Sequence, residues 1–389
     1  MNTFGIDYQQ SLTVIALREE YEGRSVIRSV GDGSRSLIPN AVSLRGEWGS
    51  RAGKQPDVFA AGVLEPTGDG AWLDDPGPGL FWHGLYSRLR SYLGRLDPLR
   101  RNGYRSVVAL QGANWEADAH AVGALARAAG FEEIVVIPST HALLCRWLST
   151  THSSLAEVPC VVAVAVGETS TQVCGFRIEW SRPGTATIAA ASIPSTLPRT
   201  GQAYWNQRLF TLLKERLSED LLAGHDRALR DAAMRYAIRL SRTEAGQSAE
   251  WREVFEDRLY QPLLLSLDRC QSWPEASNLA AQMPNAVRAA LRTISSPRPD
   301  VLVVGGVGTV WPFAEVIATG MGICPVWRSG APEDDVAAGA TRWGELCQHP
   351  SGVLLDRSVS LGQAPTPSRD PLRSLPTDDA MSIPPWERG

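Results

Sequence analysis

The sequence predicts an α/β protein with two lobes, and a repeated strand–turn–strand pattern carries most of that prediction. Val161–Val173 (VVAVAVGETSTQV) has the pattern of a buried strand, a tight polar turn and the start of a returning strand. Phe4–Ala16 (FGIDYQQSLTVIA) has the same pattern near the start of the chain. Around both stretches, strand-like segments alternate with helical ones, as in α/β domains. We therefore expect a duplicated core in which two hairpins face each other across a ligand site.

The first lobe is expected to span residues 1–157. Apolar alternation and short apolar runs predict strands over 3–17, 24–30, 36–44, 106–111 and 133–137. Helical periodicity covers 81–99, 115–129 and 140–147. The middle helix has clear end signals, because Asn114 is a favourable N-cap and Gly130 a favourable C-terminal stop. This alternation favours right-handed crossovers within one α/β lobe.

The second lobe is expected to span residues 158–332. Its predicted strands are 161–166, 172–178, 186–192 and 300–304. Its predicted helices are 205–217, 227–241, 253–270 with a break near Pro262, 286–294 and 312–319. A last helix, opened by Pro332 and followed by acidic residues on its first turn, is predicted to run to Cys347 and return to the first lobe over 333–347. Residues 348–389 are rich in Pro, Ser, Arg and Asp without periodicity, which predicts a disordered tail.

Composition excludes several classes of function. The net charge of −4 gives no basic face for a nucleic acid. The six cysteines form no CxxC pair, which is typical of free thiols in a reducing cytoplasm. The sequence has no apolar run long enough to span a bilayer and no leader pattern at its start. We expect a cytoplasmic protein that does not contact a membrane or a nucleic acid.

The order of these elements resembles a known family. The runs that carry the resemblance are VVALQGANWEADAHAVGALARAAGFEEIVVIPSTHALL, RTGQAYWNQRL, VLVVGGVGTVWP and PEDDVAAGA, together with the two hairpins. Over about residues 3–347 the chain is similar to the nucleotide-binding domain of the seventy-kilodalton heat-shock (DnaK-type) chaperones, within the actin–hexokinase superfamily. The resemblance implies a two-lobed, actin-like ATPase fold with nucleotide between the lobes. The family's peptide-binding domain has no counterpart after residue 349.

The first hairpin keeps part of the family's phosphate-binding turn. In the family, an aspartate is followed by a Gly–Thr–Thr turn whose N–H groups and hydroxyls hold the β- and γ-phosphates. The resemblance implies that Asp7, Gln10 and Ser11 are the nucleotide-binding residues here. Gln9 replaces the glycine, and its side chain would crowd a phosphate. Asp7 is interpreted either as a weak magnesium ligand or as a carboxylate that caps the hairpin.

The second hairpin departs further from the family. The resemblance places Gly167, Glu168 and Thr169 at the nucleotide, but the family's two aspartates are replaced by Ala165 and Gln172. Glu168 adds a carboxylate where the family places phosphate, and like charges about 4 Å apart at intermediate dielectric cost roughly 4 kcal/mol. A second interpretation makes Glu168 a new magnesium ligand or base.

Other catalytic parts of the family are also missing. Ser139 replaces the family's glutamate, and residues 55–85 contain no lysine where the family has a catalytic one. His141 is a candidate for proton transfer. Since phosphoryl transfer depends on positioning and charge neutralisation, losing these parts together argues against efficient hydrolysis.

The adenosine side of the family's site is better kept. Gly305, Gly306 and Gly308 match the turn under the ribose and the base, where the lack of a Cβ atom lets a flat base approach the backbone. Arg235, Arg239 and Ser241 are placed on the helix that forms the opposite wall. The alternative is that the glycines only make a tight turn between a strand and a helix.

The sequence therefore predicts a pseudo-ATPase that acts as a regulatory or scaffolding subunit and binds ATP or ADP with magnesium weakly or not at all. Its partners would be proteins, and Met381, Ile383 and Trp386 in the tail form a candidate docking motif. The main alternative is an active ATPase with a rewired site built on Asp7, Glu168 and His141. Weaker alternatives are an actin-like filament protein and a small-molecule kinase of the same superfamily.

Overall fold

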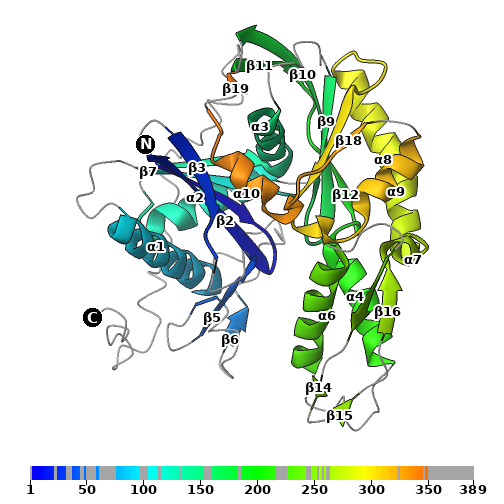
Figure 1. Ribbon diagram of the computed structural model, residues 1–389. Helices are drawn as coiled ribbons and strands as arrows, with labels where there is room; N and C mark the ends of the chain where they lie inside the picture. The colour runs from blue at the N-terminus through cyan, green and yellow to red at the C-terminus, as the bar shows by residue number, and fades with distance from the viewer. Residues whose placement is uncertain are drawn as a thin grey trace, which may run out of the picture.

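The structure is a computed structural model of the 389-residue chain. It describes residues 2–21, 24–31, 37–43, 48–49, 58–60, 76–96, 104–112, 115–131, 133–151, 160–182, 185–215, 226–241, 247–251, 254–255, 258–259, 263–322, 325–344 and 347–348. The described part is a mixed α/β fold with two large mixed sheets (Figure 1).

The first sheet has the strand order β3-β2-β1-β7-β8, and β4 (Leu37–Pro39) pairs with β2. Its main strands are β1 (Asn2–Tyr8), β2 (Leu12–Tyr21), β3 (Arg24–Ser29), β7 (Tyr104–Leu110) and β8 (Ile134–Pro138). The three strands β1 to β3 pair antiparallel, whereas β7 lies parallel to β1 and β8 parallel to β7. The strands β1 and β7 therefore end at the same edge of the sheet.

The second sheet has the order β18-β17-β9-β10-β11-β19, and β12 (Ser195–Pro198) pairs with β10. Its strands are β9 (Cys160–Val166), β10 (Ser170–Arg182), β11 (Thr185–Ala191), β17 (Val301–Gly305), β18 (Val326–Trp327) and β19 (Cys347–Gln348). Here too, three consecutive strands pair antiparallel and two later strands add parallel to the first of them. Both sheets thus share one pairing pattern, with β9 in the place of β1.

Helices cover both sheets. In the first half they are α1 (Pro76–Leu96), α2 (Trp115–Ala128) and α3 (Ser139–Thr150). In the second half they are α4 (Gln202–Lys214), α6 (Asp226–Ser241), α7 (Leu267–Gln271), α8 (Pro274–Thr293), α9 (Phe313–Met321) and α10 (Asp335–Ala340), with 3-10 turns η3 (Val307–Val310) and η4 (Pro332–Asp334). Three short strand pairs complete the described elements: β5 (Ala41–Ser43) with β6 (Val58–Ala60), β13 (Ser248–Trp251) with β16 (Leu263–Ser266), and β14 (Val254–Phe255) with β15 (Arg258–Leu259).

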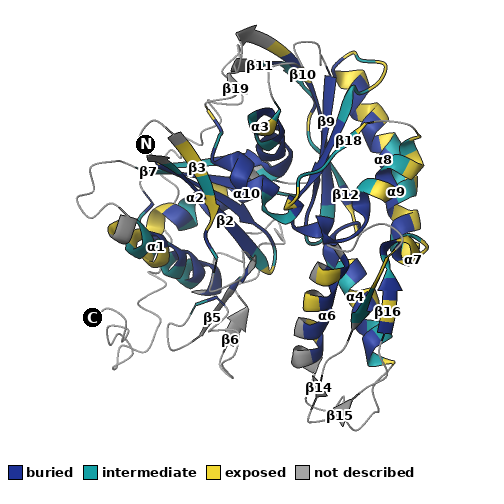
Figure 2. Ribbon diagram, viewed as in Figure 1, coloured by how far each residue is buried: buried dark blue, intermediate teal, exposed yellow. Residues whose placement is uncertain are grey.

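Helices α3 and α10 lie between the two sheets, whereas α1 and α2 lie on the other face of the first sheet (Figure 1). Figure 2 shows both central helices as largely buried. The close packing of α10 against β1 and against α3 depends on two glycines that have no room for a side chain. A Cβ on Gly5 of β1 would collide with the carbonyl oxygen of Ala337, and a Cβ on Gly339 would collide with that of Ala142. One apolar cluster therefore runs from β7 through α3 into β9 and β17.

Three predicted helices differ from the structure. Within residues 253–270 the described parts are mainly strands, because Leu263 and Leu265 are buried while Leu264 between them is exposed, which is a strand period. The helix predicted over 286–294 begins at Pro274 and continues through Pro284. The last helix ends at Ala340 rather than Cys347, and Cys347–Gln348 forms a strand beside β11.

The structure does not describe residues 349–389, so Met381, Ile383 and Trp386 lie outside it.

Within the part of the chain that the structure describes, no helix combines the length and the apolar character needed to cross a membrane.

Candidate functional site

The turns of the two hairpins meet where the edges of the two sheets face each other. The first turn joins β1 to β2 and carries Gln9, Gln10 and Ser11; the second joins β9 to β10 and carries Gly167, Glu168 and Thr169. Both predicted hairpins are present, because buried apolar strands end at polar turns in each. We call the contact between them the hairpin seam, made by Gln9, Ser11, Gln111, Gly167 and Glu168.

Glu168 is bonded directly to the first turn. The backbone N–H of Ser11 donates to Oε2 of Glu168 at 2.6 Å, and the Ser11 hydroxyl donates to Oε1 of the same carboxylate. In return, the backbone N–H of Glu168 donates to Oε1 of Gln9 at 3.2 Å. The Glu168 carboxylate therefore occupies the donors that the sequence assigned to a phosphate.

Gln9 connects Glu168 to the buried acid Asp7. Nε2 of Gln9 donates to Oδ1 of Asp7 at 2.6 Å. The backbone carbonyl of Gln9 accepts a bond from Nδ2 of Asn40 at 2.7 Å. Asp7 is fully buried, and its Oδ2 has no hydrogen-bond partner among the described residues. Burial raises the pKa of Asp7 to about 7, against a smaller lowering by the Gln9 bond. Near neutral pH this carboxyl is therefore about half protonated.

Gln111 is a member of the seam that the sequence analysis did not single out. Its Nε2 donates to the carbonyl of Ala165 at 2.7 Å and to that of Ser170 at 2.8 Å. A Cβ on Gly167 would collide with the ends of the Gln111 and Gln9 side chains, so a larger residue here would displace both ends from the seam. A signal was present: Gln111 follows β7 as Gln9 follows β1, and neighbouring parallel strands end side by side.

The glycines assigned to the adenosine side pack against the protein itself. Gly306 has a φ of +106°, and a Cβ there would lie 2.5 Å from the carbonyl oxygen of Val166. A Cβ on Gly308 would lie 2.5 Å from Cγ1 of Val166, and one on Gly305 would lie 2.5 Å from Cδ1 of Leu143. These contacts favour the tight-turn interpretation of the glycine run, because protein atoms already take the space that glycine leaves.

Three of the remaining predicted residues are on α6, and His141 is on α3. Arg235 and Arg239 are on the exposed side of α6, where the Arg239 guanidinium lies 5.8 Å from the Tyr236 ring centroid. Ser241 is the last residue of α6. His141 is buried in the core, with its ring edge-on to Phe176 at 4.9 Å and to Trp343 at 5.9 Å.

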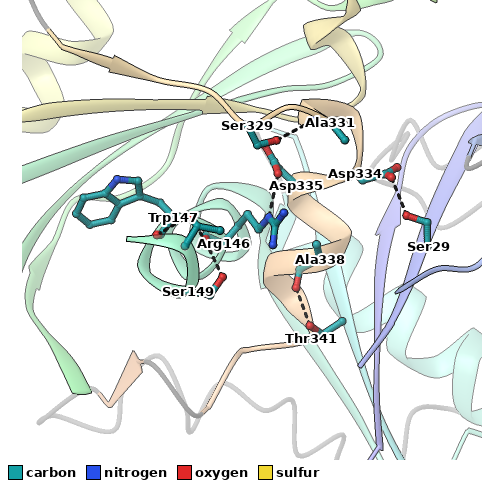
Figure 3. A network of polar contacts seen from close by, with 11 residues as sticks. Ser29, Arg146, Trp147, Ser149, Ser329, Ala331, Asp334, Asp335, Ala338 and Thr341 are labelled. Atoms are coloured by element: carbon teal, nitrogen blue, oxygen red, sulfur yellow. Dashed lines mark hydrogen bonds and ion pairs between the residues drawn. The ribbon is translucent and has the colours of Figure 1, made fainter. Parts of the chain in front are cut away.

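Two further contacts join the sheets through α3 and α10. Oε1 of Gln172 accepts weak bonds of 3.3 Å from the N–H and the hydroxyl of Thr140 at the start of α3. Nε of Arg146 on α3 pairs with Oδ1 of Asp335 at 3.1 Å, as Figure 3 shows. Burial raises the pKa of Asp335 to about 6, opposed by bonds from Ser329 and Arg146.

The seam does not have the chemistry of a magnesium–nucleotide site. Among the described residues, no three His, Cys, Asp or Glu side chains gather where they could hold a metal ion. The first turn's donors face a carboxylate, and an added phosphate would meet that negative charge. The residues at this place therefore do not fit the group that the fold resemblance implies.

Models of known protein families and curated proteins were both compared with the chain, and neither comparison gave a match.

Proposed function

We propose that this chain is a pseudo-ATPase with a two-lobed, actin-like fold similar to the nucleotide-binding domain of the heat-shock chaperones, and that it acts as a regulatory or scaffolding subunit. The shared pairing pattern of the two sheets supports the duplicated lobes. In this proposal, the lobes are held together by the protein's own side chains instead of by ATP and magnesium. The outer surfaces of the two joined lobes then bind protein partners.

The observation that carries the proposal is the bonding of the two turns to each other. Ser11, Gln9 and Gln111 each make a hydrogen bond across the seam to residues 165–170. A nucleotide's phosphates would have to break these bonds and replace them. A ligand that enters must displace bonded groups at a free-energy cost of about 1 kcal/mol for each neutral bond and more for charged ones.

Thermal melting with nucleotide tests the proposal. A ligand at a hundred times its Kd stabilises a protein by about 2.7 kcal/mol, which shifts the Tm by several degrees for a chain of this size. We expect no shift with millimolar ATP or ADP in the presence of magnesium. A saturable shift with ATP would refute the proposal.

The second candidate is ATP hydrolysis at a rewired site, and one observation favours it. Oδ2 of Asp7 has no hydrogen-bond partner among the described residues, and a rewired site would supply that partner as a water molecule or a cation. Phosphate release that is lost in Asp7→Asn and Glu168→Gln, and retained in the exposed control Asp268→Asn, would establish this candidate. The proposal of a pseudo-ATPase expects no release above background in any of the four proteins.

A further inference from the structure

We propose that the Glu168 side chain takes the place of a bound anion on the first hairpin and that its carboxyl group acts as a proton-sensitive latch between the two sheets. The latch would regulate the contact between the two turns on which the proposed function depends. It rests on the proposed function only in taking the hairpin seam as the place where the two lobes are held together. It concerns the free protein and needs no nucleotide.

The geometry is that of an anion bound by a turn. A backbone N–H and a hydroxyl of one residue, Ser11, converge on the two oxygens of one carboxylate. Turns that direct such donors outward bind phosphates and carboxylates from solution. Here the anion comes from the same chain, 157 residues away.

The backbone of Glu168 is fixed from the side of the second sheet. Helix α4 begins against the second turn, where the N–H of Gln202 donates to the carbonyl of Gly167 at 3.0 Å and that of Ala203 donates to the carbonyl of Glu168 at 2.7 Å. A Cβ on Gly201 would collide with the Glu168 backbone, so helix and turn are in close contact. The carboxylate is thus presented to Ser11 by a rigid support, as a latch requires.

The environment of Glu168 makes this contact depend on its charge. Among the described residues, Glu168 bonds to Ser11 and Gln9 of the first turn and to the N-terminus of α4. The acids near these elements are Asp7, bonded to Gln9, and Asp118, whose Oδ2 lies near Gly112 after β7. Burial raises the pKa of Glu168, and the two Ser11 donors offset only part of that effect.

The direction of the pH response follows from this shift. Closing the seam removes part of Glu168 from water and raises its pKa, so the closed state binds a proton more tightly than an open state does. Protonation therefore favours the closed seam, and ionisation as the pH rises favours opening. The closing equilibrium changes tenfold for each unit by which closure raises the pKa.

Amide hydrogen exchange, corrected for intrinsic rates, measures the latch directly in peptides that contain Ser11 and Glu168. We expect their protection in the wild-type chain to fall as the pH rises from 5.5 to 8. Glu168→Gln keeps the shape without a titrating group at this position, so its protection should exceed that of the wild type at pH 8 and fall less steeply with pH. Glu168→Ala removes the acceptor, so its protection should be lower than that of the wild type across the whole range. The fall with pH that remains in both variants is the one expected from Asp7. The control Glu179→Gln, an exposed acid on β10, should follow the wild type.

Two results would overturn the latch. Protection in Glu168→Ala equal to that of the wild type would show that Glu168 does not hold the seam. The protection in Glu168→Gln could instead fall with pH as steeply as in the wild type, and Asp7→Asn could abolish that fall. This result would assign the proton to Asp7. Should Glu168→Ala fail to fold, Glu168→Gln and the wild type still decide the proton dependence. Nucleotide binding by the wild type would refute the pseudo-ATPase and leave these exchange results unaffected.

Discussion

Replacing Asp7 by Asn is expected to remove a large pH dependence of folding stability. The pKa of Asp7 rises from an ordinary value of 3.8 to about 7 in the folded chain because the side chain is fully buried. The folded state therefore binds more protons than the unfolded state between these values, so stability falls as the pH rises through this range. At about 1.4 kcal/mol per tenfold change in a protonation equilibrium, the loss between pH 5 and pH 8 is about 3 kcal/mol.

Asparagine preserves the contacts of this position without the charge, because its Oδ1 can still accept the bond from Nε2 of Gln9. We expect Asp7→Asn to exceed the wild type in unfolding free energy by an amount that grows by about 3 kcal/mol from pH 5 to pH 8. Urea denaturation at several pH values measures this difference. Asp268→Asn, the same chemical change at an exposed site, should show no such growth. Parallel curves for Asp7→Asn and the wild type would refute the reasoning.

Two other substitutions test the packing around the seam, each against a matched control. Gly306→Ala should cost roughly 3 kcal/mol of unfolding free energy, because it adds a clash with the Val166 carbonyl to the strain of a positive φ. Its control, Gly322→Ala, also lies at positive φ but has no atom within 4 Å of its Cβ, so it should cost about 1 kcal/mol in the same denaturation assay. Equal losses would contradict the close packing of the turn. Arg146→Ala leaves the buried Asp335 without its cation and should cost about 3 kcal/mol at pH 8. Arg28→Ala, which removes an exposed cation from its pair with the part-buried Glu19, should cost under about 1 kcal/mol. A loss for Arg146→Ala no larger than the control's would mean that Asp335 does not depend on this pair.

The sequence predicted the two hairpins and the strands beside them because local patterns encode both. Apolar runs such as VVAVAV determine a buried strand, and the polar turn after it determines where the strand ends. The helix expected over 253–270, with a break near Pro262, agrees with the described residues only at its end, where α7 lies. Before α7, the alternation of Leu263, Leu264 and Leu265 has a period of two and forms a strand.

The candidate site was predicted by place but not by its bonds. Asp7, Ser11 and Glu168 were expected at facing turns, and the structure brings them together through Gln9. Local sequence patterns do not indicate which donor will bond to which acceptor when the two residues are 157 positions apart. The position of Gln111 after β7 indicates its place beside the first turn, whereas its partners, the carbonyls of Ala165 and Ser170, have no side-chain signature.

The late position of α10 in the chain has a consequence for biosynthesis. Residues 335–340 fill the space between the two sheets, and Gly5 on β1 meets Ala337 only after they have been made. Val14 and Ala16 of the first sheet pack against the same helix. While the ribosome is still translating the second half, this face of the first sheet remains without its cover. The first sheet therefore completes its core only when nearly all of the described chain has left the ribosome.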